Sequence, residues 1–82
     1  METKVAVIAI IAESRDSAEE INDILHEYGE YIIGRMGIPY REKKLNVINV
    51  VVDAPHDVIS AMAGKIGNLS NVTVKTAYSG CN

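Results

Sequence analysis

Two histidines and one cysteine carry the nitrogen and sulfur atoms that transition metals prefer in this 82-residue chain, namely His26, His56 and Cys81. No two of them stand at the short spacing that metal-binding motifs use, and a lone cysteine cannot form an internal disulfide. We therefore expect surface histidines and no cofactor, with a metal site shared between subunits as an open alternative. The single cysteine also favours a reducing cytoplasm.

Acidic side chains are concentrated between Glu13 and Glu30, where two carboxylates could act as general acid and base. Their spacing is more simply that of the solvated face of a helix. No serine–histidine–aspartate or cysteine–histidine set converges, and catalysis needs a nucleophile or base held by a partner. We predict that the chain is not an enzyme.

The basic residues gather around one predicted hairpin, at Arg35, Arg41, Lys43 and Lys44. This cluster could bind an anionic small molecule or an acidic partner surface, although charges at a hairpin tip also protect it against edge pairing. Nearby tyrosines complete the candidate ligand- or partner-binding set, which is Tyr28, Tyr31, Arg35, Tyr40 and Arg41.

The tetrapeptide Gly34-Arg35-Met36-Gly37 looks like the GxxG clamp of KH RNA-binding domains, whose loop joins two helices. Here Pro39 and a hairpin follow, and the formal net charge of −3 does not suit phosphate neutralisation. An edge strand, with glycines where another backbone or side chain comes close, is the favoured interpretation. Nucleic-acid binding through the Gly34–Gly37 stretch is the alternative.

Four predicted strands differ in character. Lys4–Ala12 and Leu45–Val52 are apolar at both parities, as in strands buried on both faces. Tyr31–Tyr40 and Asn71–Ser79 carry the glycine, proline, threonine and lysine residues that edge strands tolerate. The apolar run Val5–Ala12 is too short to span a bilayer, so no membrane association is expected.

Two amphipathic helices separate these strands. Ser17 and Glu20 form a predicted capping box for the first helix, and Gly29 is expected to end it in the left-handed conformation. Pro55 is placed near the start of the second helix and Gly67 at its end. The predicted buried stripes are Ala18, Ile21, Ile24, Leu25 and Tyr28, then Val58, Ile59, Met62, Ala63 and Ile66.

The order strand–helix–strand–strand–helix–strand predicts a single ferredoxin-like α+β domain over residues 1–82. Right-handed crossovers give this βαββαβ chain a four-stranded antiparallel sheet in the order 4-1-3-2, with both helices on one face. The two strands that are apolar on both sides would then expose aliphatic side chains on the other face. We predict that this open face packs against another subunit in a dimer or tetramer.

Two long segments, LHEYGEYIIGRMGIPYREK and VVDAPHDVISAMAGKIG, resemble the small regulators of the iron-only hydrogenase system. The resemblance implies an oligomeric ferredoxin-like domain, similar to ACT domains and to the regulatory domain of the nickel-responsive repressor. It implies a regulatory role with a small-molecule effector or a protein partner of the hydrogenase system. The repressor's sheet histidines and cysteine have no counterpart on the second and third strands, and the chain begins directly with a strand. Nickel binding and direct DNA binding are therefore not expected.

Overall fold

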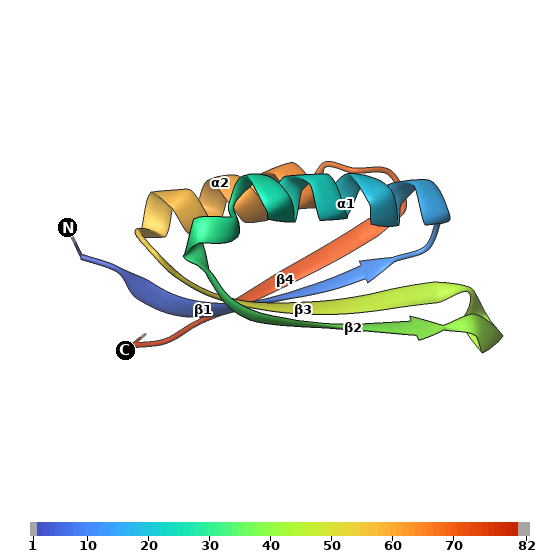
Figure 1. Cartoon of the computed structure of the whole chain (residues 1–82), viewed down its shortest axis with the longest axis horizontal. Coiled ribbons are helices and arrows are strands. Elements are labelled where there is room, and N and C mark those ends of the chain that lie inside the picture. The colour runs from blue at the N-terminus through green and yellow to red at the C-terminus, as the bar shows by residue number, and fades with distance from the viewer. Residues whose placement is uncertain (1, 81–82) are drawn as a thin grey trace.

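The computed structural model describes residues 2–80, which form a four-stranded sheet with two helices on one face (Figure 1). The elements are β1 (Lys4–Ala12), α1 (Arg15–Glu27), η1 (Gly29–Tyr31), β2 (Ile32–Tyr40), η2 (Arg41–Lys43), β3 (Leu45–Ala54), α2 (His56–Gly67) and β4 (Val72–Tyr78). All neighbouring strands are antiparallel and lie in the order β2-β3-β1-β4, which confirms the predicted fold and topology.

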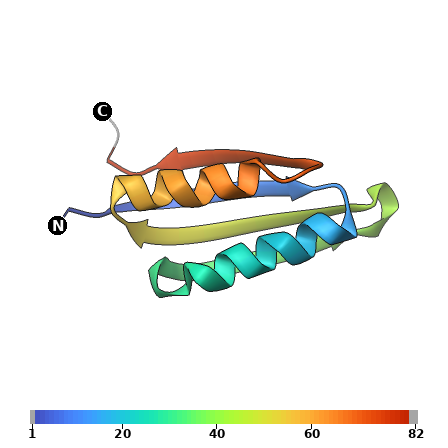
Figure 2. The same ribbon diagram turned by 90° about the horizontal axis from the view of Figure 1, so that it is seen from above.

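Each helix covers one half of the sheet. Seen from above, α1 lies over β2, α2 lies over β1 and beside β4, and β3 runs between the two helices (Figure 2). Alternate residues of the central strands point at the helices and are buried, which gives Ala6, Ile8, Ile10 and Ala12 from β1 and Ile48, Val50, Val52 and Ala54 from β3. The helices contribute Ile21, Leu25, Ile59, Met62 and Ile66. The core is aliphatic, as the absence of Phe and Trp requires.

Ser14 caps α1, so the predicted capping box at Ser17 and Glu20 is wrong. Ser14 has extended backbone angles, and its Oγ accepts a hydrogen bond from the Ser17 N–H at 3.2 Å. Ser17 lies inside the first turn and is 2% exposed. Its hydroxyl accepts from the Ser14 hydroxyl at 2.8 Å and donates to the Ser70 carbonyl, which joins the two turns at this end of the molecule.

The end of α1 also differs from the prediction. The helix stops at Glu27, and Tyr28 bonds through its backbone N–H to the Ile24 carbonyl at 3.2 Å. Gly29 does not take a positive φ, because the chain continues into the 3-10 turn η1 and needs no left-handed residue there. Gly67 ends α2 as predicted.

A β-bulge near Ile33 changes which face the side chains of β2 occupy. Ile32 lies opposite Val52, whereas Gly34 lies opposite Val51. The extra residue shifts the alternation, so Ile32 does not share a face with the later even-numbered residues of β2. Ile32 pairs with the buried side of β3, and the rest of β2 places Met36, Ile38 and Tyr40 on the opposite side of the sheet.

Candidate functional site

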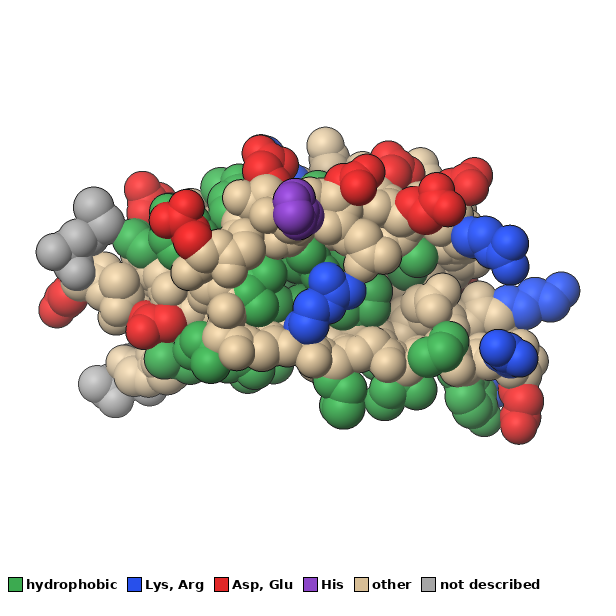
Figure 3. Space-filling view, in the orientation of Figure 1, with side chains coloured by type: hydrophobic (Ala, Val, Ile, Leu, Met, Phe, Trp, Pro, Cys, Tyr) green, Lys and Arg blue, Asp and Glu red, His purple; other side chains and the backbone are tan. Residues whose placement is uncertain are grey.

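The face of the sheet that carries no helix is apolar. We call this the open face, and its exposed large side chains are Val5, Val7, Ile11, Met36, Ile38 and Tyr40. Val5, Val7 and Ile11 are each 40% exposed, and Met36 is 56% exposed. In Figure 3 hydrophobic side chains line the lower edge of the molecule, whereas acidic side chains gather over the helices.

Polar side chains interrupt the open face at several points, and Asp53 lies opposite Val5 and Thr73 opposite Ile11. Asn49 lies opposite both Met36 and Ala9, and Ala9 lies opposite Lys75 on the edge strand β4. Apolar rows run on either side, because Val7 pairs with Val51 and Ile11 pairs with Val47. A partner that covers this face must therefore satisfy the Asp53 carboxylate, the Asn49 amide and the Lys75 ammonium group as well as aliphatic side chains.

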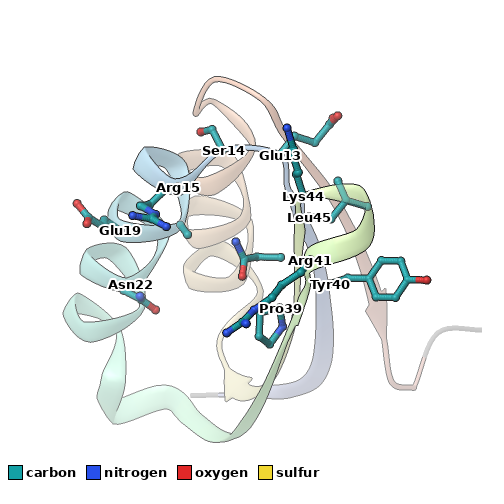
Figure 4. Close-up of a pocket in the computed structure, with 12 residues that line it drawn as sticks. Glu13, Ser14, Arg15, Glu19, Asn22, Pro39, Tyr40, Arg41, Lys44 and Leu45 are labelled. Atoms are coloured by element: carbon teal, nitrogen blue, oxygen red, sulfur yellow. The ribbon is translucent and has the colours of Figure 1, made fainter.

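A groove of about 640 Å³ lies on the helix side, between the start of α1 and the β2–β3 turn. Its charged lining residues are Glu13, Arg15, Glu19, Arg41 and Lys44. Figure 4 shows Arg41 and Pro39 reaching from the hairpin toward α1, whereas the Tyr40 ring points to the opposite side. Tyr40 therefore contributes its ring to the open face and mainly its backbone to the groove.

Local structure fixes both walls of this groove. Ser14 holds the start of α1, and Lys44 adopts a left-handed conformation with φ 56° that closes the hairpin turn. On the helix wall, the Arg35 guanidinium donates a hydrogen bond of 2.7 Å to Asn22 Oδ1. Arg35 on β2 thereby holds the orientation of a groove residue without lining the groove itself.

The predicted tyrosines at the other end of β2 form a separate cluster. The rings of Tyr28 and Tyr31 lie 6.4 Å apart, and Lys65 Nζ lies 5.2 Å from the Tyr28 centroid. Lys65 also forms an ion pair of 3.2 Å with Glu27. The hydrogen bond to the Glu27 carboxylate, followed by that to Tyr28, raises the pKa of Lys65 above 10.5.

The five predicted binding residues do not meet at one place. Tyr31 and Arg41 flank the nine-residue strand β2, so they lie roughly 30 Å apart at about 3.3 Å per residue. Arg35 lies between them on the helix side, and Tyr40 faces the open side. Sequence reasoning did not include Arg15 and Asn22. These two residues could have been found from the predicted topology, because it brings the β1–α1 turn beside the β2–β3 turn.

Gly34 and Gly37 lie within the extended edge strand β2 and not in a loop between helices. Apart from the two neighbouring residues in the chain, a Cβ atom added at either glycine would meet no atom of residues 2–80 within 4 Å. The close neighbour that the sequence led us to expect is therefore not supplied by residues 2–80 of the same chain. Both glycines leave space beside β2.

The histidines occupy exposed positions on different helices. His56 stacks on Tyr78 with ring centroids 5.0 Å apart, and His26 lies in the last turn of α1. Cys81 lies outside the described residues. Among residues 2–80, no three His, Cys, Asp or Glu side chains are placed to hold a metal ion. Neither helix in this range is long and apolar enough to cross a membrane.

Comparison with known proteins decides the family. The family model described as "TM1266-like: Iron-only hydrogenase system regulator, putative" matches residues 4–76. The chain belongs to the TM1266-like family. A solved structure, that of the uncharacterized protein TM1266 from Thermotoga maritima, is 32% identical and superposes with a TM-score of 0.91. The match covers 95% of this chain and 99% of that one. No curated protein matches.

This membership confirms the resemblance that the segments Leu25–Lys43 and Val51–Gly67 carried. It places the chain among proteins described as regulators of the iron-only hydrogenase system. The same fold, including both helices and the sheet, extends over almost the whole length of the Thermotoga protein.

Proposed function

We propose that this TM1266-like protein is a non-enzymatic regulatory module of the iron-only hydrogenase system that works as a homo-oligomer. In this proposal the module responds to a small ligand or to a protein partner of that system. The family match supports the regulatory role. The open face supports the assembly, and it is the observation that carries the proposal.

The energy available at the open face is comparable with the stability of a whole domain. Full burial of a large aliphatic side chain gives about 1.5–3 kcal/mol. The six large apolar side chains of the open face, whose exposed fractions average a little under half, retain roughly 4–8 kcal/mol per protomer, against about 5–15 kcal/mol for domain stability. Apolar patches of this kind on soluble domains usually mark interaction surfaces.

A second copy of the chain is a suitable partner for such a face. An isologous interface brings the same patch of both subunits together around a two-fold axis. The sheet offers the same aliphatic rows to each copy, separated by the row of Asn49 and Lys75, which limits the number of acceptable alignments. The space left beside Gly34 on this face also admits close approach of a partner.

The decisive experiment is native mass spectrometry combined with light scattering across a range of protein concentrations. We expect a dimer or tetramer for the unmodified chain. Ile11→Glu places a charge in the middle of an apolar row, and burying it unpaired costs about 3 kcal/mol or more, which raises Kd at least roughly 100-fold. Ala61→Glu, on the exposed side of α2, is the matched control and should assemble normally.

Two results would contradict the proposal. One is an unmodified protein that stays monomeric at concentrations of about 100 μM, where a Kd in the micromolar range gives assembly. The other is an Ile11→Glu variant that assembles as well as Ala61→Glu while keeping the same circular dichroism spectrum. The mass spectra would also reveal any metabolite that copurifies with the protein.

A further inference from the structure

We infer that the groove between α1 and the β2–β3 turn binds a small organic anion that carries a carboxylate or phosphate group. Arg15, Arg41 and Lys44 supply the positive charge, and Asn22 supplies a hydrogen-bond donor. This inference gives the proposed sensing role a site and a ligand class, and it rests on that role for its physiological meaning.

Three cationic side chains from two distant segments line one groove in a chain whose net charge is −3. Arg15 comes from the first turn of α1, and Arg41 and Lys44 come from the hairpin turn. Within residues 2–80, the one ion pair joins Lys65 to Glu27, so none of the three is neutralised by a carboxylate. Clustered cations without counterions favour an anionic ligand, and guanidinium groups match carboxylate and phosphate oxygens in bidentate geometry.

The acidic residues of the lining do not occupy the middle of the groove. In Figure 4 the Glu13 and Glu19 carboxylates point away from the space between the helix and the hairpin. Their charges at the rim would still repel an extended polyanion. The arrangement therefore favours a small anion over a nucleic-acid backbone, whose recognition needs many cations along one surface.

The hydrogen bond from Arg35 orients the Asn22 side chain so that its NH₂ group can donate to a ligand. Arg35 can only donate hydrogen bonds, so its 2.7 Å contact must use the amide oxygen of Asn22. The amide NH₂ of Asn22 is then the end that remains for a ligand in the groove. Arg35 is thus a positioning residue, and this contact explains how a side chain outside the groove could influence binding inside it.

The groove is larger than an inorganic ion requires. Its volume of about 640 Å³ lies within the range of roughly 300–1,000 Å³ that is typical of small-molecule sites. Ala18, Pro39 and Leu45 add apolar lining beside the charged groups. An anion with a short apolar body therefore fits this lining better than phosphate alone.

The test is a titration of the full chain with benzoate and with phenyl phosphate, followed by amide chemical shifts in NMR spectra. Benzyl alcohol is the neutral control. We expect at least one anion to bind with a Kd of about 1–10 mM, a range typical of weak small ligands. The shifts should occur at the start of α1 and in the β2–β3 turn, and benzyl alcohol should cause none there. The two anions distinguish a carboxylate site from a phosphate site.

Matched variants separate the groove from general surface charge. Arg41→Gln should weaken binding at least 5-fold, whereas Lys43→Gln, in the same turn but outside the groove, should change it less than 2-fold. Arg35→Ala should weaken binding 2- to 5-fold in the unmodified chain and have no further effect in an Asn22→Ala background. That loss of additivity is expected of a positioning residue and not of a general loss of charge.

Three results would overturn the inference: no saturable shifts with either anion up to about 50 mM, equal weakening by Arg41→Gln and Lys43→Gln, or equal binding of benzyl alcohol. Light scattering on the same samples keeps the two proposals apart. An intact oligomer that binds no anion contradicts the groove alone. A monomer that binds the anion contradicts the proposed assembly alone.

Discussion

Replacing Ser17 with alanine should destabilise the protein although this side chain is small and far from the centre of the core. Its hydroxyl accepts from Ser14 and donates to the Ser70 carbonyl, so it links the β1–α1 turn to the turn before β4. Ser17→Ala leaves two polar partners without this bond in a site that is 2% exposed. A buried polar group left unsatisfied costs about 1–3 kcal/mol.

We expect Ser17→Ala to lower the free energy of unfolding by about 2 kcal/mol. This net value already includes a few tenths of a kcal/mol by which the higher helix propensity of alanine offsets the lost hydrogen bonds. Ser14→Ala removes the helix cap and should cost about 1 kcal/mol. Because both variants remove the Ser14–Ser17 hydroxyl bond, the double variant should lose less than the sum by about 0.5–1 kcal/mol.

The assay is urea unfolding of the three variants at one fixed protein concentration, because assembly would make stability concentration-dependent. Thermal unfolding should show a fall in Tm of roughly 8–16 °C for Ser17→Ala. Ser60→Ala, at an exposed position of α2, is the matched control and should change stability by no more than about 0.5 kcal/mol. Strict additivity of the two substitutions, or a Ser17→Ala protein as stable as the unmodified chain, would refute the reasoning.

Two further substitutions test single backbone and charge features. Lys44→Gly should stabilise the protein by about 0.5–1 kcal/mol in urea unfolding because Lys44 has φ 56°, whereas Lys44→Ala removes the same charge without relieving the strain and should not stabilise it. Glu27→Gln should lower stability at neutral pH, because the folded state raises the pKa of Lys65. That contribution is complete below pH 10.5 and is lost as the pH rises through the raised value, so unfolding curves of the two proteins should converge above it. If the two proteins instead differed in stability by the same amount at every pH, the ion pair between Lys65 and Glu27 would not be the cause of the difference.

The sheet order could be predicted because the strands differ in residue type. Leu45–Val52 is apolar at both parities and must be central, whereas Pro39 and the two glycines beside it restrict β2 to an edge. The helix start could not be fixed in the same way. Ser14 and Ser17 both fit a cap, and only packing shows that Ser17 lies on the buried side of α1.

The candidate binding residues were harder to place than the fold. The basic hairpin is visible in the sequence at Arg41–Lys44, and the structure adds Arg15 and Asn22 from a segment that is distant along the chain. Tyr40 and Arg41 are neighbours in sequence, yet they face different sides of the sheet. Local sequence reports which charges lie close together along the chain, whereas the groove depends on how two turns meet in space.

The bulge at Ile33 has a consequence for how homologous chains are aligned. Because of the bulge, β2 places Ile32 on the helix side of the sheet and Met36 and Ile38 on the open face. A chain that lacks this one extra residue would keep Ile32 opposite Val52 and Gly34 opposite Val51 in strict alternation, so Arg35 would still face Asn22. An alignment of such a relative that omits the one-residue gap would therefore match inward-facing positions of β2 with outward-facing ones on one side of the bulge.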